Sequence, residues 1–332
     1  VVFWAGGAIQ RVDVNTGDVT NIAFSVNDTR EIVDPPRPSV EVAPASFQTQ
    51  MPRFTSVSPN GEQVVFESLG KLYIMDTDGG EPRRLTRDRS DRRELVPSWS
   101  RDGRRLVFVT WDDQDLGSVR TVAANGRSER TLTNEPGTYR RPRFSPDGET
   151  VVFEKDGGGF LTSRAWSETT GVFAVSASGG DMREIADSGS NPHFGAANDR
   201  LFMTRRTPDL ELYSVDLNGY DERVHANGGM TGEFHVAPDG RHLAFRENYD
   251  AFVMPMPVGP QNISVSKSSG SLPVVELSSN GATDINWSDN GNQINWTMGA
   301  ELFSATIDEI RPNPKPTHSY QQPHTENHPP DH

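Results

Sequence analysis

The sequence contains no cysteine and no apolar run long enough to form a membrane-spanning helix. Without cysteine there are no disulfides, thiolate nucleophiles or zinc-thiolate sites, although this absence does not distinguish cytoplasm from periplasm. Positive charge is also scarce: 32 Lys and Arg residues stand against 46 Asp and Glu residues, a net charge of −14. Nucleic-acid binding requires a basic face that displaces counterions from phosphates. The composition therefore argues against a nucleic-acid partner.

Common catalytic motifs are missing as well. The sequence has no His-x-His, no His-Glu-x-x-His and no Gly-x-Ser-x-Gly, the patterns that mark metal-dependent hydrolases and serine hydrolases. An enzyme acting in its own right would need a clustered metal or acid-base set, and the sequence shows none. We therefore predict no catalytic residue, no metal site and no cofactor in this chain, and leave open whether its parent polypeptide is an enzyme.

What the sequence does contain is a recurring hairpin. Residues 143–155, "RFSPDGETVVFEK", read as a strand, a Pro-Asp-Gly turn and a second strand, because proline and glycine suit successive positions of a tight turn. Six copies occur, each with a large apolar residue five positions after the turn residue. The turn residues are Gly61, Gly103, Gly148, Asn198, Gly240 and Gly291. Asparagine is expected to replace glycine in the fourth copy because it tolerates the left-handed conformation.

The spacing of these turns predicts the fold class. They recur at intervals of 42 to 51 residues, and each interval contains further strand-like sequence ending in another turn. A period of this length with four strands per repeat is typical of β-propellers. We therefore predict an all-β protein, a six-bladed propeller of four-stranded antiparallel blades, with seven blades as the alternative.

The two ends of the chain show complementary defects in the repeat. Residues 1–17 align without a gap to the second and third strands of the first copy, so we expect a partial blade, a hairpin that belongs to an upstream repeat. Residues 18–24 are predicted to supply the outer strand of the last blade, which closes a propeller spanning 18–310. Residues 311–332 contain six prolines and four histidines and are expected to form a linker or disordered tail. The mid-repeat start suggests an internal segment of a longer polypeptide.

The longer loops of the predicted propeller are expected to form a binding face. Loops between second and third strands share one face with the loops between blades, and the short Pro-Asp-Gly turns occupy the other. Aromatic, arginine and carboxylate side chains on the first face suit recognition of a polar chain or another domain; exposed loop residues without a binding role are the alternative. The candidate residues around this channel mouth are Trp111, Asp112, Asp113, Tyr139, Arg140, Arg141, Arg164, Trp166, His193, Arg205, Arg206, His235 and Tyr249.

The repeated Ser-Pro-Asp-Gly hairpin resembles the repeat of TolB-like propellers. Segments such as "VVFWAGGAIQRVDV", "TWDDQDLGSVR", "NPHFGAANDRLFMTR" and "GAELFSA" also resemble the propeller region that precedes the catalytic domain of large bacterial TolB-like amidohydrolases. None of that domain's metal-binding or catalytic residues can be assigned to this chain, because its His-x-His motif is absent.

This resemblance implies a non-catalytic propeller that docks on a metal-dependent amidohydrolase domain or gates substrate access to it. A free-standing TolB-like protein-binding propeller is the alternative. The expected partners are the amidohydrolase domain or another protein, with a peptide-like or small polar substrate as a further candidate ligand. The expected location is periplasmic or secreted.

Overall fold

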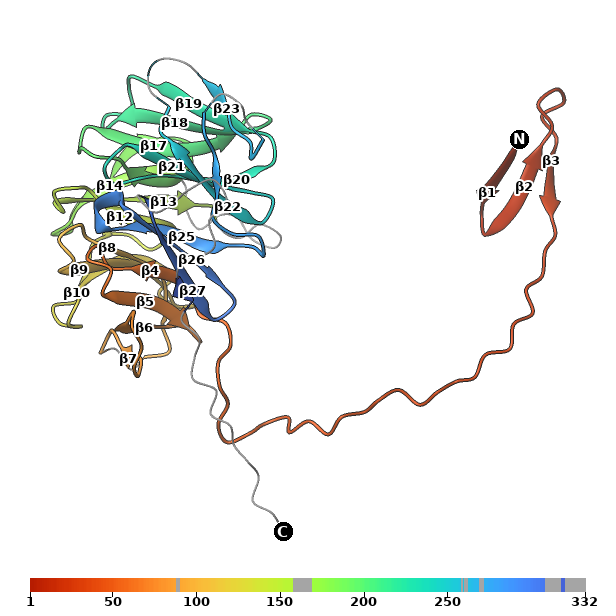
Figure 1. The fold of residues 1–332 in the computed structure, drawn as a ribbon, viewed down its shortest axis with the longest axis horizontal. Coiled ribbons are helices and arrows are strands. Elements are labelled where there is room, and N and C mark those ends of the chain that lie inside the picture. Colours follow the sequence, from red (N-terminus) through yellow and green to blue (C-terminus); the bar gives the residue numbers. More distant parts are fainter. Residues whose placement is uncertain are drawn as a thin grey trace, which may run out of the picture. The chain divides into compact units, whose positions relative to one another are not determined.

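The computed structural model describes residues 1–87, 90–157, 169–257, 259, 262–268, 272–307 and 318–319. The chain forms two compact units, Val1–Gln48 and Thr49–His332. The first unit contains one antiparallel sheet of three strands, in the order β1-β2-β3 (Figure 1). Its strands are β1 (Val2–Ala5), β2 (Ala8–Val12) and β3 (Val19–Ile22).

In the described part of the second unit the strands form six sheets, numbered 1 to 6 in chain order. Sheet 1 contains β4 (Arg53–Val57), β5 (Gln63–Ser68), β6 (Lys71–Asp76) and β7 (Arg83–Arg84). Sheet 2 contains β8 (Arg93–Trp99), β9 (Arg105–Trp111), β10 (Ser118–Ala123) and β11 (Arg130–Thr131). Sheet 3 contains β12 (Thr138–Phe144), β13 (Thr150–Asp156), β14 (Gly171–Ser176) and β15 (Arg183–Ala186).

Sheet 4 contains β16 (Ser190–Phe194), β17 (Arg200–Arg206), β18 (Leu210–Asp216), β19 (Arg223–Gly228) and β23 (Ile263–Ser264), the last of which pairs with β19 in parallel. Sheet 5 contains β20 (Thr231–Val236), β21 (His242–Glu247), β22 (Asp250–Pro255) and β24 (Val275–Glu276). Sheet 6 contains β25 (Thr283–Ser288), β26 (Gln293–Met298), β27 (Glu301–Thr306) and β28 (His318–Ser319). The prediction of four-stranded antiparallel sheets is confirmed for five of the six sheets, and sheet 4 adds the short parallel strand β23 to four antiparallel strands.

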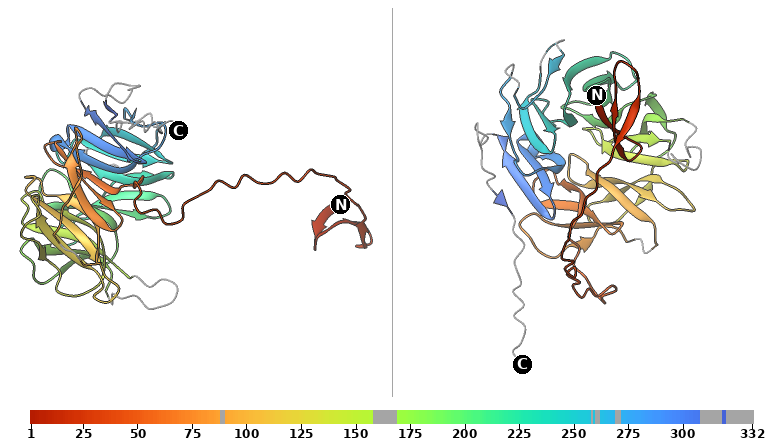
Figure 2. Two further views of the ribbon diagram at one scale, coloured as in Figure 1. Left: turned by 90° about the horizontal axis from the view of Figure 1, so that it is seen from below. Right: turned by 90° about the vertical axis from the view of Figure 1, so that its right-hand side faces the viewer.

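The core lies between neighbouring sheets. In β9, Leu106, Val107 and Phe108 are consecutive and each is 0% exposed, so this strand is covered on both faces, as its continuous apolar sequence predicts. The apolar clusters join strands of adjacent sheets; Val107 of sheet 2, for example, belongs to the same cluster as Phe153 of sheet 3. Figure 2 shows the sheets of the second unit arranged around a common centre. The first strand of each sheet is therefore the one that can line this centre.

The fourth hairpin turn differs from the prediction. The five turn glycines all have positive φ, from 69° at Gly103 to 93° at Gly291, whereas Asn198 does not adopt the left-handed conformation, so the proposed equivalence of Asn198 with glycine is wrong. Its side chain instead forms hydrogen bonds with the neighbouring turn. Asn198 Nδ2 donates to Asp147 Oδ2 at 2.8 Å and Asn198 Oδ1 accepts from the Asp147 backbone N–H at 3.2 Å. The asparagine ties the turn of sheet 4 to the turn of sheet 3.

The predicted strand exchange between the chain ends is also wrong. Residues 19–22 form β3, which pairs with β2 in the register Val12–Val19 to Ile9–Ile22. β27 pairs instead with β26 and with His318–Ser319, two residues of the predicted tail. A hairpin joined by the short turn at Asp13–Asp18 needs little loop-closure entropy, and this favours the local pairing of β3 over a pairing with a strand far along the chain.

Candidate functional site

Each innermost strand of the second unit contains a β-bulge, which begins at the same repeat position in five of the six strands and one residue earlier in β20. The register shifts lie between Arg53 and Ser56, Leu95 and Ser98, Arg140 and Arg143, Ser190 and His193, Thr231 and Glu233, and Thr283 and Asn286. In five of the six strands the first bulge residue has a φ between 45° and 54°; these residues are Phe54, Val96, Arg141, Asn191 and Asp284. In β20, Gly232 occupies the bulge. A bulge re-aims side chains locally, here toward the centre of the sheets.

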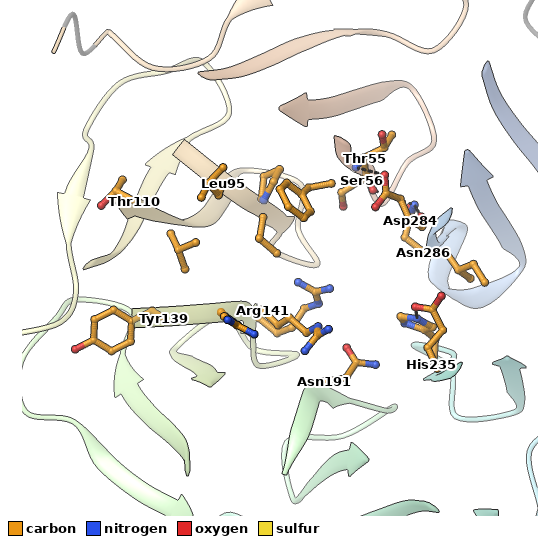
Figure 3. A pocket seen from close by; sticks show the side chains of 18 of the residues that line it. Thr55, Ser56, Leu95, Thr110, Tyr139, Arg141, Asn191, His235, Asp284 and Asn286 are labelled. Carbon is orange, nitrogen blue, oxygen red and sulfur yellow. Dashed lines mark hydrogen bonds and ion pairs between the residues drawn. The ribbon is translucent and has the colours of Figure 1, made fainter. Parts of the chain in front are cut away.

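The side chains around the bulges surround a cavity of about 710 Å³. One residue from each sheet, seven positions before the hairpin turn residue, lines it: Phe54, Val96, Arg141, Asn191, Glu233 and Asp284. The wall from sheets 1 and 2 is largely apolar and includes Phe54, Leu95, Val96, Pro97 and Val109, whereas sheets 4 to 6 contribute polar and charged groups. Figure 3 shows Leu95 on one side of the cavity and His235 and Asn286 on the other.

A second, narrower cavity of about 350 Å³ adjoins the first. The residues five positions before the turn residues all line it: Ser56, Ser98, Arg143, His193, His235 and Asn286. Five residues, Ser56, Arg143, His235, Ile285 and Asn286, line both cavities. We call the region around these five residues the junction.

Arg141 and Asn191 are held by one buried carboxylate. Arg141 Nη1 lies 3.0 Å from Glu154 Oε1 and 3.2 Å from Oε2, and the backbone N–H of Asn191 donates to Glu154 Oε1 at 2.6 Å. The Asn191 amide in turn donates from Nδ2 to the carbonyl of Phe234 at 2.9 Å. A single carboxylate therefore positions cavity residues of sheets 3 and 4, and Asn191 links sheet 4 to sheet 5.

His193 is a neutral connector between sheets 4 and 5. Its Nε2 accepts from the backbone N–H of Val236 at 3.0 Å, and its Nδ1 lies 2.7 Å from the carbonyl oxygen of Asn191. Because Nε2 accepts, the proton must be on Nδ1, which donates to the carbonyl. Burial lowers the pKa of His193 to about 3. Both ring nitrogens are occupied by the scaffold, although the side chain lines the narrower cavity.

The polar wall of the larger cavity carries two carboxylates with opposite pKa shifts. Burial disfavours ionisation of Glu233, but hydrogen bonds and charges from His235 at 2.9 Å and Arg246 at 2.6 Å outweigh it and lower its pKa to about 2. Burial raises the pKa of Asp284, although the backbone N–H of Thr55 donates to its Oδ2 at 3.1 Å. Glu233 is thus a compensated anion, and Asp284 is the more easily protonated of the two.

The structure brings together six of the thirteen residues predicted for the binding mouth. Trp111, Tyr139, Arg140, Arg141 and His235 line the larger cavity, and His193 lines the narrower one. Five others line neither cavity: Asp112, Asp113, Arg205, Arg206 and Tyr249. Arg164 and Trp166 lie outside the described residues.

Local contacts explain several of these positions. Tyr139 is only 4% exposed, and its hydroxyl donates to the Glu135 carbonyl at 2.9 Å; burial raises its pKa. The indole N–H of Trp111 donates to Asp113 Oδ1 at 2.8 Å.

The remaining predicted residues are engaged in local contacts or exposed. Asp112 accepts backbone N–H groups of its own loop at 2.8 and 3.0 Å. Arg205 pairs with Glu211 at 2.9 Å and with Glu222 at 2.9 Å. Arg206 donates to the carbonyl of Thr231 at 3.4 Å, and the side chain of Tyr249 is 77% exposed.

Sequence reasoning missed most of the cavity wall, including Phe54, Leu95, Arg143, Asn191, Glu233 and Asp284. The signal was present in the repeat, because counting seven and five positions back from each turn residue identifies both sets of wall residues. Among the described residues no group of three or more His, Asp and Glu side chains is arranged to hold a metal ion. No helix in the described ranges has the length and apolar character needed to span a membrane.

Comparisons with known proteins agree with this geometry. The chain matches no protein-family model. It is 26% identical over 192 residues to the Tol-Pal system protein TolB of Francisella tularensis subsp. mediasiatica, a match that covers 54% of this chain and 41% of that protein. It is also 28% identical over 111 residues to dipeptidyl-peptidase 5 of Porphyromonas endodontalis, covering 30% of this chain and 16% of the peptidase. The match thus covers about two fifths of the full length of that TolB protein.

Solved structures resemble the chain over more of its length. TolB from Acinetobacter baumannii matches with a TM-score of 0.54 at 16% identity, covering 91% of this chain and 73% of that one. An oligogalacturonate lyase in complex with manganese matches with a TM-score of 0.53 at 12% identity, covering 87% and 78%. Radially arranged four-stranded antiparallel sheets around a central cavity define the class of β-propellers. Within that class, the chain contains a TolB-like propeller.

Proposed function

We propose that this propeller is a protein-binding module that holds a segment of a polypeptide partner in the larger cavity. The observation that carries the proposal is the division of the cavity wall: Phe54, Leu95 and Val96 form an apolar side, and Asn191 and Asp284 belong to a polar side. A polypeptide offers both apolar side chains and backbone hydrogen-bonding groups, so it can satisfy both walls at once. Ligand sites commonly combine apolar lining with a few placed polar groups.

We further propose that the six sheets are six blades that close into a ring. Contacts between the last and first sheets support this, because they repeat those between sheets 4 and 5. Asn286 Oδ1 accepts the N–H of Val57 at 3.0 Å, as His193 Nε2 accepts the N–H of Val236 at 3.0 Å; the two donors and the two acceptors occupy equivalent repeat positions. Under this proposal the ring is closed by side-chain and backbone contacts rather than by an exchanged strand.

The propeller would act as part of a larger exported protein. The resemblance of the repeat region to TolB-like amidohydrolases supports docking on, or gating of, a metal-dependent amidohydrolase domain, with a periplasmic or secreted location. The similarity of 111 residues to a dipeptidyl-peptidase supports the same arrangement with a hydrolase as partner. A free-standing protein-binding propeller, as suggested by the similarity to TolB, is the second candidate. In both cases the larger cavity is the proposed contact.

Site-specific photocrosslinking tests the proposed binding site. A benzoylphenylalanine replaces Phe54 in the larger cavity, and a matched variant carries it at Tyr220, a 73% exposed side chain near the β18–β19 turn. The chain is expressed in its native host with its natural flanking sequence. We expect the Phe54 variant to form a discrete crosslink to one polypeptide or to one neighbouring domain, and the Tyr220 variant to form none. Equal crosslinking at both positions would refute a specific site.

Affinity measurements then use the crosslinked partner. Truncation of a buried aromatic or arginine contact in an interface costs about 2 kcal/mol or more, so Trp111→Ala and Arg141→Ala should each weaken binding by roughly 30-fold. The control is Arg120→Ala, which removes an arginine that pairs with Glu129 at 2.7 Å and lines neither cavity. If Arg120→Ala weakens binding as much as the other two variants, the cavity is not the contact surface.

A further inference from the structure

The arginines that line the two cavities differ in their partners. Arg140 pairs with Asp156 at 2.9 Å and Arg141 with Glu154 at 3.0 Å. Arg101, which lines the narrower cavity, donates to the carbonyls of Gly195 and Ala196. Arg143 has no carboxylate partner among the described residues. It lies at the junction, since it lines both cavities.

The hydrogen bonding of Arg143 leaves one edge of its guanidinium open. Within the described part of the chain its side chain makes a single hydrogen bond, from Nη1 to the carbonyl of Pro142 at 3.0 Å. The Nε–H and the Nη2–H groups therefore have no protein acceptor there. These two groups point in parallel along one side of the guanidinium and match the two oxygens of a carboxylate. The free edge has the geometry for bidentate carboxylate binding.

The surroundings compensate the charge of Arg143 only in part. Burial, assisted by the charge of the neighbouring Arg141, lowers the pKa of Arg143 to about 10, although the charge of Glu154 opposes this shift. Glu154 itself accepts hydrogen bonds from Arg141 and from the backbone N–H of Asn191. Two further carboxylates that line the larger cavity are also engaged: Glu233 is compensated by His235 and Arg246, and Asp284 accepts from Thr55. An anion placed at the junction would therefore meet a partly desolvated cation that forms no ion pair with a carboxylate of the described residues.

We infer that the junction, which Ser56 also lines, binds a carboxylate of the polypeptide partner, with the Nε and Nη2 groups of Arg143 as its donors. This inference rests on the proposed function and adds to it the chemical group that is recognised. The narrower cavity, about 350 Å³, has the size of a small-ligand pocket and admits a chain end or one side chain rather than a folded surface. The carboxylate is accordingly either the C-terminus of the partner or an Asp or Glu side chain near it.

Defined peptides test the carboxylate site. The probes are acetyl-Leu-Phe as the free acid, the same peptide as its C-terminal amide, and acetyl-Leu-Glu-Phe amide, whose only carboxylate is internal. Binding to the full chain is followed by intrinsic fluorescence, because Trp99 and Trp287 line the narrower cavity. We expect the free acid to bind at least tenfold more tightly than its amide. Tighter binding of the internal-Glu peptide than of acetyl-Leu-Phe amide would identify an acidic side chain as the source of the carboxylate.

Arginine variants connect the preference to one residue. In Arg143→Met the ratio of acid to amide affinity should fall to about one. Arg143→Lys, which keeps the charge but loses the planar fork, should retain only a small part of the preference and serves if the Met variant does not fold. Arg120→Met, outside both cavities, should keep the wild-type ratio. A preference for the acid that persists in Arg143→Met would overturn the assignment.

The remaining outcomes are also decisive. Equal affinity of all three peptides for the wild-type chain overturns the carboxylate site. If no peptide binds, thermal denaturation with acetate replacing chloride at constant ionic strength is measured; an unchanged midpoint overturns the site, and a rise that is absent in Arg143→Met supports it. Photocrosslinking at Phe54 does not depend on Arg143. A crosslink without any acid preference would therefore leave the protein-binding proposal standing and remove only the carboxylate.

Discussion

Mild acid should weaken the link between sheets 4 and 5 through His193. The pKa of this side chain is about 3 in the folded chain, chiefly because of burial, against an ordinary value of 6.5. Between these two values the unfolded chain binds a proton that the folded chain does not, so stability falls as the pH falls. The slope is about 1.4 kcal/mol per pH unit for one histidine, and lowering the pH from 7 to 5 should cost about 2 kcal/mol.

The His193→Gln variant isolates this contribution. At pH 7 it should be less stable than the wild type by about 1–3 kcal/mol, because one amide cannot reproduce both buried hydrogen bonds of the imidazole. At pH 5 the difference should shrink by about 2 kcal/mol, since the variant no longer carries the group that resists protonation. Urea denaturation followed by tryptophan fluorescence at both pH values measures the two differences.

A second histidine provides an internal check on the same reasoning. Burial, assisted by the charges of Arg200 and Arg223, lowers the pKa of His225 to about 4, and its Nε2 lies 2.7 Å from the Ser214 hydroxyl. His225→Gln should therefore show a similar narrowing of its stability difference between pH 7 and pH 5. A difference between wild type and His193→Gln that stays constant from pH 7 to pH 5 would refute the buried, neutral state of His193.

Three further predictions concern stability, each measured by chemical denaturation. Gly148 has a φ of 74°, so Gly148→Val should cost about 1–3 kcal/mol of stability. Asn198→Gly removes exposed hydrogen bonds to Asp147 and should cost under about 1 kcal/mol. Equal losses of stability in the two variants would contradict the different turn geometries. Asn286→Leu should cost about 1–3 kcal/mol because it leaves a backbone N–H of β4 unpaired, and a neutral effect would argue against the contact between sheets 6 and 1. Trp296 is 2% exposed, so Trp296→Ala should lower the free energy of unfolding by about 3–5 kcal/mol. A smaller loss would mean that the core of sheet 6 is loosely packed.

The parts of the fold that the sequence predicts are those that repeat. A turn glycine followed five residues later by a buried apolar side chain recurs because each sheet must reverse its chain and pack against the next sheet. Phe108, Phe153 and Phe245 occupy this position and are 0% exposed. Self-similarity identifies such positions because the same packing requirement acts on every copy.

The strand pairing at the chain ends could not be predicted in the same way. The alignment of residues 1–17 with the first repeat identifies the strands of the first hairpin. Sequence similarity between repeats does not show, however, with which neighbouring strand an edge strand pairs. The local hairpin of β2 and β3 and the short strand β28 provide the actual partners. Nothing in the proline-rich sequence around His318 signals a strand, because β28 is two residues long and is defined by its pairing with β27.

The cavity wall escaped prediction for the opposite reason: its positions repeat while its residues differ. Seven positions before the turn, the six copies carry Phe, Val, Arg, Asn, Glu and Asp. The bulge directs the side chain at this position toward the centre in each sheet. Packing between sheets does not restrict which residue type occupies the position. A position that is regular in geometry but variable in chemistry is where a repeat protein can build an asymmetric site. Loop length, by contrast, is a poor guide to the site: five of the loop and strand-end residues predicted for the binding mouth line neither cavity.

The asymmetry of this wall also determines how a ligand would be oriented. Phe54 and Val96 come from sheets 1 and 2, and the charged or amide side chains come from sheets 3 to 6. A symmetric wall would offer six equivalent orientations to a bound chain, whereas here apolar side chains can be buried on only one side. With Arg143 at the junction below the bulges, a carboxylate would fix the depth of the ligand while the apolar wall fixes its rotation. Two different groups of residues, five and seven positions from the same turns, would thus specify a single pose.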